Sequence, residues 1–260
     1  MQVVSLHEKQ DIELWLRNNI DLHLYCLGDL DDFFWKHTIW YGLKNEEEIK
    51  AIILLYIKTE IPTLIALAEK PADNMQVLLE SVVRLFPLQI YAHLNEEFLS
   101  ILARYYQIQS HGKYYKMALK DTSHLALVDT SEVLSLSIAD IEELEQLYLE
   151  SYPSNWFDKK MLETGYYYGI RLNSKLVSVA GIHVYSSTYR VAALGNITTH
   201  PQFRGKGLAT AVITKLCQAL LPKVEHIGLN VAANNHSAIT CYKKLGFERV
   251  ASYYECSLSK

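Results

Sequence analysis

The chain has 260 residues, half of them hydrophobic, and a formal net charge of −4. This length allows one large domain or two of ordinary size, and the acidic balance argues against a broad surface for nucleic acid. The N-terminal segment MQVVSLHEKQDIELWL carries acidic residues where a secretory leader is apolar, and apolar runs such as Ala51–Ile57 are too short to span a bilayer, so we predict a cytoplasmic protein without a membrane partner.

The first half alternates helix-like and strand-like segments. The pattern predicts helices over Asp11–Asn18, Asp21–Phe34, Asp73–Phe86 and Glu96–Tyr106, and strands over Thr38–Leu43, Ile49–Lys58, Thr63–Ala68, Gln89–Leu94 and Lys113–Leu119.

The second half repeats this order more clearly. Helices are predicted over Ile138–Ser151, Asp158–Thr164, Leu208–Leu221 and Ser237–Leu245, and strands over Tyr166–Leu172, Leu176–Ser186, Val191–Thr199, His226–Val231 and Phe247–Ser257. Asn173-Ser174-Lys175 suits a hairpin turn between the first two of these strands.

The two halves also match in sequence pattern. IYAHLNEEFLSILARYYQ aligns with GLNVAANNHSAITCYKKLG, and the pairs Tyr114-Tyr115 and Tyr253-Tyr254 then coincide. We predict an internal duplication, with a first domain over residues 1–121 and a second over residues 122–260. Two unrelated halves with a similar alternation are the alternative interpretation.

Cysteine and histidine show no metal-ligand spacing. The four cysteines are scattered without a CxxC pair, and the ten histidines include no HExxH motif. We therefore predict reduced thiols, no disulfide framework and no metal.

A glycine-rich loop, QFRGKGLAT at residues 202–210, precedes a predicted helix. The first amides of a helix lack partners and carry partial positive charge, and glycines let the backbone close around an anion. Arg204 and Lys206 add positive charge and Thr210 adds a hydroxyl. The pattern predicts a phosphate cradle, although it lacks both GxxxxGK(S/T) and GxGxxG; a plain turn is the alternative.

A second motif, NNHSAITCYKKLGF, covers residues 234–247. Asn235 and Ser237 can cap the helix that begins there, and Tyr242 lies on the same helix face as Ala238. A tyrosine in such a place is more often a packing residue than a catalytic one.

The two motifs together resemble the GNAT superfamily of acyl-CoA-dependent N-acetyltransferases. The nearest branch is the one with the C-terminal domain of glycine N-acyltransferase. The pyrophosphate loop of that family, (Q/R)-x-x-G-x-(G/A), is matched by Arg204, Gly207 and Ala209. The resemblance covers the second half by motif and the first half only through the order of its elements.

The resemblance implies an α/β (α+β) fold with two tandem GNAT-like domains. Each would be a mixed, mostly antiparallel sheet flanked by helices, and the sheet of the second would splay at the cofactor site. The co-substrate would be acetyl-CoA or another acyl-CoA. The cofactor-binding residues would be Ile197, Thr198 and Thr199 along the pantetheine arm, Arg204, Gly205, Lys206, Gly207, Leu208, Ala209 and Thr210 around the pyrophosphate, and Asn235 and Ser237 beyond them.

The resemblance also implies the catalytic groups. Tyr242 would protonate the departing thiolate as general acid, and a backbone N–H of the splayed strand would stabilise the oxyanion. Some relatives carry a carboxylate base where this chain has Ala193. The base is therefore left open among His183, Tyr185, Glu150 and a water relay through Asn196, with His200 less suitable.

The first half lacks the cradle. Its corresponding loop is Glu69-Lys70-Pro71-Ala72-Asp73, in which no glycine occurs, two carboxylates would repel phosphate and Pro71 lacks an N–H. We predict that the first half binds no cofactor, packs like the second subunit of a GNAT dimer and walls the acceptor site, so that a monomer is plausible.

The predicted function is transfer of an acetyl or other short acyl group from acyl-CoA to a small-molecule or peptide amine. One alternative is a non-catalytic acyl-CoA-binding sensor. Another is aminoacyl transfer on a doubled GNAT fold, against which the intact loop and the negative charge argue. The sequence does not identify the acceptor.

Overall fold

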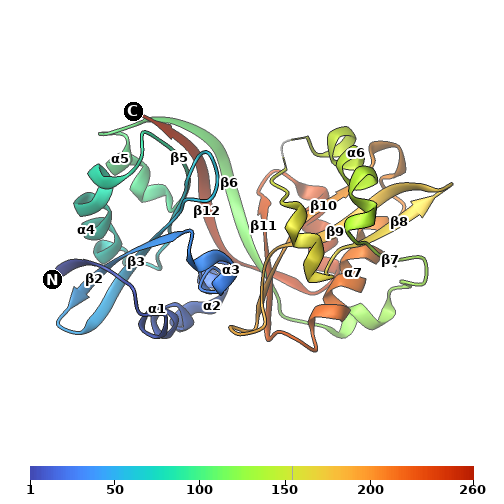
Figure 1. Ribbon diagram of the computed structural model, residues 1–260, viewed down its shortest axis with the longest axis horizontal. Coiled ribbons are helices and arrows are strands. Elements are labelled where there is room, and N and C mark those ends of the chain that lie inside the picture. The colour runs from blue at the N-terminus through green and yellow to red at the C-terminus, as the bar shows by residue number, and fades with distance from the viewer. Residues whose placement is uncertain (154) are drawn as a thin grey trace. The chain divides into compact units, whose positions relative to one another are not determined.

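A computed structural model describes residues 1–153 and 155–260 as two compact units (Figure 1). Unit 1 consists of Met1–Lys116, Val231–Asn234 and Arg249–Lys260, and unit 2 of Met117–Asn230 and Asn235–Glu248. The end of the chain therefore packs within unit 1, whereas the order of elements assigns it to the domain over residues 122–260. A domain boundary predicted from sequence divides the chain at one point, so it cannot describe a unit that is made of separate segments.

Unit 1 is built on a sheet of strand order β1-β2-β3-β4-β5-β12-β6. Its strands are β1 (Gln2–Ser5), β2 (Thr38–Asn45), β3 (Glu48–Tyr56), β4 (Thr63–Ala66), β5 (Gln89–Leu94), and most of β6 (Gln107–Leu119) and β12 (Phe247–Ser259). Its helices are α1 (Lys9–Leu16), α2 (Ile20–Gly28), α3 (Asp32–Trp35), α4 (Asp73–Val82) and α5 (Leu99–Leu102), with 3₁₀ turns at Arg17–Asn19, Val83–Leu85 and Glu96–Phe98.

Unit 2 carries the strand order β11-β10-β9-β8-β7. Its strands are β7 (Leu134–Ser135), β8 (Tyr168–Leu172), β9 (Lys175–Ser186), β10 (Val191–Thr199) and most of β11 (His226–Ala232). Its helices are α6 (Ile141–Ser151), α7 (Leu208–Leu220) and α8 (His236–Lys244), with 3₁₀ turns at Ser123–Leu127, Ile138–Asp140, Lys159–Thr164 and Pro201–Phe203.

Both units show one arrangement of strands and helices. In unit 1, β2, β3 and β4 pair antiparallel, and α4 leads to β5, which lies parallel to β4. In unit 2, β8, β9 and β10 pair antiparallel, and α7 leads to β11, which lies parallel to β10. The predicted fold class, mixed and mostly antiparallel sheets flanked by helices, is confirmed.

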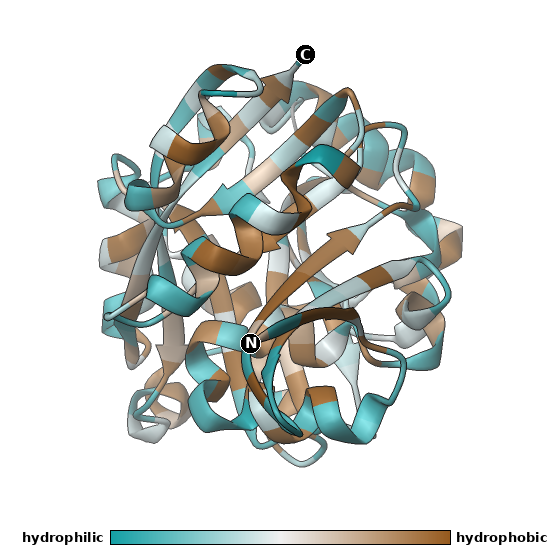
Figure 2. Cartoon of the chain, turned by 90° about the vertical axis from the view of Figure 1, so that its left-hand side faces the viewer, coloured by the Kyte–Doolittle hydropathy of each residue, from teal (hydrophilic) through white to brown (hydrophobic). Residues whose placement is uncertain are grey.

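Apolar faces of the helices pack on these sheets. The buried residues of α4 are Met75, Leu78, Leu79 and Val82, and this i, i+3, i+4, i+7 spacing places them on one face. Figure 2 shows the consequence as alternating hydrophobic and hydrophilic bands along the helices. Among the described residues, no helix is both long and apolar enough to cross a membrane.

Gly246 closes α8 in a conformation that only glycine adopts easily, with φ of 90°. Its carbonyl accepts hydrogen bonds from the N–H groups of Lys120 and Asp121, at 3.0 and 3.2 Å. A Cβ at this position would lie 1.8 Å from the carbonyl oxygen of Asp121. Backbone must therefore move before any side chain can be accommodated.

We expect Gly246→Ala to lower the free energy of unfolding of unit 2 by about 2–4 kcal/mol, the sum of left-handed strain and overpacking. Gly165→Ala is the matched control, because Gly165 also has a positive φ of 76° but nothing within 4 Å of an added Cβ. Urea denaturation followed by circular dichroism measures both variants. Equal losses would show that the contact with Asp121 adds nothing to the strain.

Candidate active site

The sheet of unit 2 opens between β10 and β11. In these parallel strands, only Val191–Leu194 of β10 pair with His226–Leu229 of β11. Beyond these pairs, β10 continues to Thr199 and β11 to Ala232. Thr198 and Thr199 stay paired with β9 on their other side. The predicted splay of the sheet is therefore present, and Ile197, Thr198 and Thr199 lie beyond the last pair with β11.

A bulge accompanies this opening. The register between β9 and β10 shifts between Gly195 and Thr198, and Asn196 has a φ of 54°. Asparagine is among the few residues that tolerate this left-handed conformation. The bulge turns the buried Asn196 side chain into the interior of unit 2.

Polar groups surround the bulge on every side. The Asn196 N–H donates to Nε2 of His183 at 3.2 Å, and its carbonyl accepts from the Tyr148 hydroxyl at 3.0 Å. Its side-chain amide donates to the Tyr167 hydroxyl at 2.9 Å, and its Oδ1 accepts from Asn155 at 3.3 Å. Backbone and side chain of the bulge are thus both satisfied, as buried polar groups must be.

Two glycines make room for the rings of this network. A Cβ on Gly195 would lie 1.2 Å from the ring of His183, and a Cβ on Gly181 would lie 2.2 Å from the ring of Tyr167. The rings therefore lie directly against the backbone of β10 and β9. The sequence pattern indicated Asn196 only as part of a water relay and gave no role to Tyr148 or Asn155. Glycines inside predicted strands were the available signal.

The glycine-rich loop has the geometry of an anion cradle. Gly205 and Gly207 have φ of 77° and 80°, and a Cβ on either would meet nothing within 4 Å, so the site beside them is open. Gly207 caps α7 without a side-chain hydrogen bond, and the first bond of the helix runs from Ala211 N–H to the Gly207 carbonyl. The amides of Leu208, Ala209 and Thr210 precede it and have no intrahelical acceptor.

Cationic side chains flank the cradle. Nε of the exposed Arg204 donates to the carbonyl of Thr199 at 3.1 Å, which holds the end of β10 to the loop. The Lys206 ammonium lies over the Phe203 ring at 5.2 Å. The hydroxyl of Thr210 lies 3.3 Å from Sγ of Cys241 on α8, so it holds the two helices together and only its N–H faces the loop.

Asn235 caps α8. Its Oδ1 accepts from the Ala238 N–H at 3.2 Å and from the Ser237 hydroxyl at 3.1 Å, which leaves its Nδ2 as a donor for a ligand. The motif of residues 234–247 thus builds this cap, and Ser237 acts through Asn235.

Tyr242 projects from α8 into the interior and is only 7% exposed. Burial, followed by the neighbouring Cys241 and Tyr152, raises its pKa well above the usual value, so the hydroxyl keeps its proton at neutral pH. Its ring packs on Phe247 at 5.9 Å between centroids. Within residues 1–153 and 155–260, its hydroxyl has no hydrogen-bond partner.

The candidate bases differ sharply in their surroundings. Glu150 accepts from Gln146 at 2.6 Å and from Lys175 at 2.9 Å, and it also pairs with His200 at 3.0 Å. These contacts lower its pKa to about 2, the hydrogen bonds from Gln146 and Lys175 first. Glu150 is therefore a weak base held in an ion-pair cluster.

Tyr185 and His183 are half-buried on β9. Tyr185 packs on Tyr166 at 4.7 Å between ring centroids, and burial followed by a hydrogen bond with Tyr185 raises the pKa of Tyr166 to about 12. Nε2 of His183 already accepts the Asn196 N–H. Of the three candidates, the structure brings only His183 to the bulge. Ala193, where the family resemblance places a carboxylate in some relatives, is fully buried in the paired part of β10.

No cluster of three or more His, Cys, Asp or Glu side chains suited to a metal ion occurs in the described part of the chain. All four cysteines are free, and three of them are buried.

The corresponding place in unit 1 is closed. Residues Thr63–Ala66 of β4 pair with Tyr91–Leu94 of β5. Directly beyond them, the side-chain amide of Asn95 donates to the carbonyl of Ala68, and its Oδ1 accepts the Ala68 N–H, both at 2.9 Å. Both backbone groups of Ala68 are therefore occupied.

Part of this chain matches a known protein family. Residues 135–247 match the model of the acetyltransferase (GNAT) family. No curated protein matches the chain. Among solved structures, a GNAT-family protein from Novosphingobium aromaticivorans is 20% identical, with a TM-score of 0.57 over 80% of this chain and 88% of that one.

Two further structures match nearly end to end. A Drosophila protein is 11% identical, with a TM-score of 0.71 over 99% of this chain and 98% of its own. A tandem GNAT protein from the clavulanic acid biosynthesis pathway is 13% identical, with a TM-score of 0.59 over 98% and 97%. At these identities the likeness establishes the fold, and together with the family match it shows that this chain contains a GNAT acetyltransferase domain over residues 135–247.

Proposed function

We propose that the second half transfers an acetyl or other short acyl group from acyl-CoA to an amine. The observation that carries this proposal is the opening between β10 and β11, which leads to a loop with two left-handed glycines and three helix amides without intrahelical partners. An open strand edge takes up an extended amide-bearing chain by backbone hydrogen bonds, and helix amides take up phosphate.

The residues present fit an acyl-CoA. Ile197, Thr198 and Thr199 offer the strand edge for the pantetheine arm. The amides from Gly205 to Thr210, with Arg204 and Lys206, offer donors and positive charge for the pyrophosphate. Nδ2 of Asn235 is available for the arm beside α8.

In the proposed acyl transfer, groups of this chain donate a proton and stabilise the oxyanion. The amine nitrogen forms a bond to the thioester carbon, the carbon–sulfur bond breaks, and the amine loses one proton. Tyr242 donates its proton to the departing thiolate and is later reprotonated from solvent. Because the Asn196 N–H is bound to His183, we assign the oxyanion contact to Ile197, which lies within the register shift.

Removal of the amine proton is assigned to water. Glu150 has a strongly lowered pKa, and Nε2 of His183 could take a proton only by giving up the Asn196 N–H. Asn155, Asn196 and Tyr167 offer polar groups that could orient such a water.

The repeated arrangement of elements supports a tandem duplication in which unit 1 is a scaffold without cofactor. Its loop over residues 69–73 lacks glycine, and Asn95 fills the position of the splay. A cytoplasmic monomer remains our expectation, as does the branch of glycine N-acyltransferase. A non-catalytic acyl-CoA sensor would share the cradle but would not need a buried, protonated Tyr242.

Release of free thiol from acetyl-CoA tests the activity directly. We expect a panel of small amines and peptide amines to include at least one that accelerates thiol release above the rate without acceptor, with an equal amount of acylated amine detected by mass spectrometry. Acetyl-CoA binding without acceleration by any amine would favour the sensor.

Gly207→Glu is expected to remove cofactor binding. Calorimetry on the wild type should give one acetyl-CoA per chain, because unit 1 has no cradle. The carboxylate would enter the open space beside Gly207, and its repulsion of the pyrophosphate should weaken binding at least about 100-fold. Gly207→Ala, which carries the same φ strain without the charge, is the control. Equal affinity of both variants for acetyl-CoA would mean that the loop is a plain turn.

Tyr242→Phe should lower turnover about 100-fold, the low end for general acid catalysis, because a thiolate with a pKa near 8.5 is a fairly good leaving group. Acetyl-CoA affinity should change less than about tenfold, since one neutral hydrogen bond contributes about 0.5–1.5 kcal/mol. Turnover is measured with the acceptor found in the panel and affinity by calorimetry. Full activity of the Phe variant would leave Tyr242 as a packing residue.

A further inference from the structure

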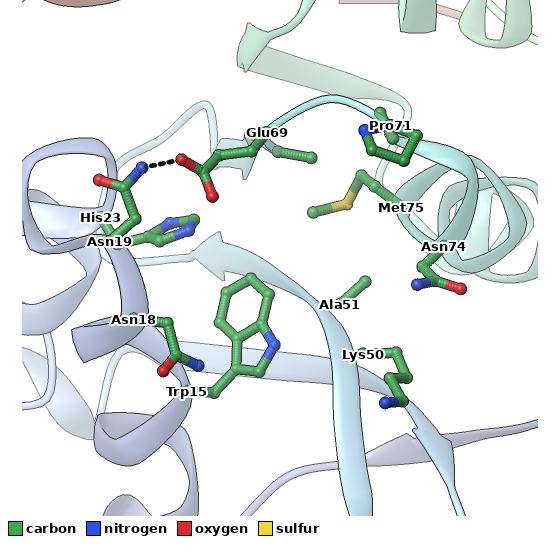
Figure 3. Close-up of a pocket in the computed structure, with 12 residues that line it drawn as sticks. Trp15, Asn18, Asn19, His23, Lys50, Ala51, Glu69, Pro71, Asn74 and Met75 are labelled. Atoms are coloured by element: carbon green, nitrogen blue, oxygen red, sulfur yellow. Dashed lines mark hydrogen bonds between the residues drawn. The ribbon is translucent and has the colours of Figure 1, made fainter.

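A pocket of about 210 Å³ lies within unit 1, between α1, the following 3₁₀ turn, α2 and the start of α4. Figure 3 shows Trp15 on one side of it and Met75 on another, with His23, Asn19 and Glu69 at one end. A space of this volume holds several waters and accepts a small ligand. Every lining residue belongs to unit 1.

His23 is the unusual group in this pocket. It is only 7% exposed and its ring packs on Trp15 at 4.9 Å between centroids. In the described part of the chain, neither ring nitrogen has a hydrogen-bond partner. The ring nitrogens are not among the fully buried atoms that lack a partner, so they are reachable from the pocket, and Figure 3 shows the ring directed into it.

The charge of His23 also constrains the ligand. Burial, followed by the nearby Lys116, lowers its pKa to about 3, so the imidazole is neutral at physiological pH. A neutral imidazole offers one donor and one acceptor. It can therefore accept a hydrogen bond from an ammonium group without repelling it.

Polar groups lie at both ends of the pocket. At one end, Oε1 of Glu69 accepts from Asn19 at 2.5 Å, which fixes the carboxylate beside His23. At the other end lie Lys50, which pairs with Glu48 at 2.5 Å, and the start of α4. The cap of that helix, Ala72, provides no side-chain hydrogen bond, so its first amides are available to an anion. Asp73, the acidic residue of the first turn, does not line the pocket.

We infer that this pocket binds a small zwitterion, a free α-amino acid. Its ammonium group would bind Glu69 and His23, and its carboxylate would bind the first amides of α4 beside Lys50. Trp15 and Met75 would contact the aliphatic part. This site is separate in sequence and chemistry from the proposed acyl-CoA site and does not rest on acyl transfer.

Calorimetry and tryptophan fluorescence on the full chain, without acyl-CoA, test the site. The probes are glycine, alanine, serine, threonine and valine, and the analogues of alanine are propionate, which lacks the amine, and ethylamine, which lacks the carboxylate. We expect one or more of the amino acids to bind one per chain, and alanine to bind at least tenfold tighter than either analogue. No binding by any of the five at about 10 mM, or equal binding of alanine, propionate and ethylamine, would overturn the inference.

Single-residue variants test whether the amino acid binds in this pocket. Glu69→Gln and His23→Leu should each weaken the amino acid that binds at least tenfold, whereas Glu97→Gln, an exposed carboxylate of unit 1 outside the pocket, should not. Glu69 is exposed, so its variant keeps the test valid if His23→Leu does not fold. Trp15→Phe should abolish the fluorescence change. Unaltered affinity in Glu69→Gln would overturn the site.

Gly207→Glu separates this site from the proposed function. If the amino acid binds that variant as it binds the wild type, the pocket of unit 1 is the site irrespective of acyl transfer. Loss of amino-acid binding in Gly207→Glu would instead place the ligand at the acyl-transfer site and refute the pocket.

Discussion

The bulge at Gly195 and Asn196 is the constraint on which the second unit depends. It ends the pairing of β10 with β11 and places a left-handed asparagine in the interior. A strained, buried backbone persists only where its surroundings determine it. Here His183, Tyr148, Tyr167 and Asn155 satisfy the backbone and side chain of Asn196, and Gly195 admits the His183 ring.

The first unit has the same arrangement of strands, but its parallel pair does not open at the end. Its parallel pair β4 and β5 also ends before a helix, but Asn95 then bonds to both backbone groups of Ala68. A side-chain amide thereby occupies the place that an extended ligand would take. One arrangement of strands can thus end in an open pair or in a pair closed by a side-chain amide, and a few residues at the strand ends decide which.

Features that depend on neighbouring residues along the chain were predictable. The strands Gln89–Leu94 and Val191–Thr199 have the predicted bounds, and Asn173 and Ser174 form the predicted turn with φ of 51° and 63°. Features that depend on distant contacts were not. The helix predicted over Glu96–Tyr106 is reduced to Leu99–Leu102 after a 3₁₀ turn, and neither the ion pairs of Glu150 nor the packing of residues 249–260 in unit 1 could be read from spacing.

Ala193 stands where the family resemblance places a carboxylate base in some relatives. The charges around the opening affect how readily an amine loses its proton without such a base. The acidic Glu150 pairs with Lys175 and lies 3.0 Å from Nε2 of His200, while the groups at the bulge are amides, tyrosines and His183. Burial raises the pKa of Tyr148 and Tyr167, so these hydroxyls stay uncharged. A buried environment disfavours the charged form of an amine and lowers its pKa. An amine that enters such a site is more readily neutral, and a dedicated carboxylate base becomes less necessary.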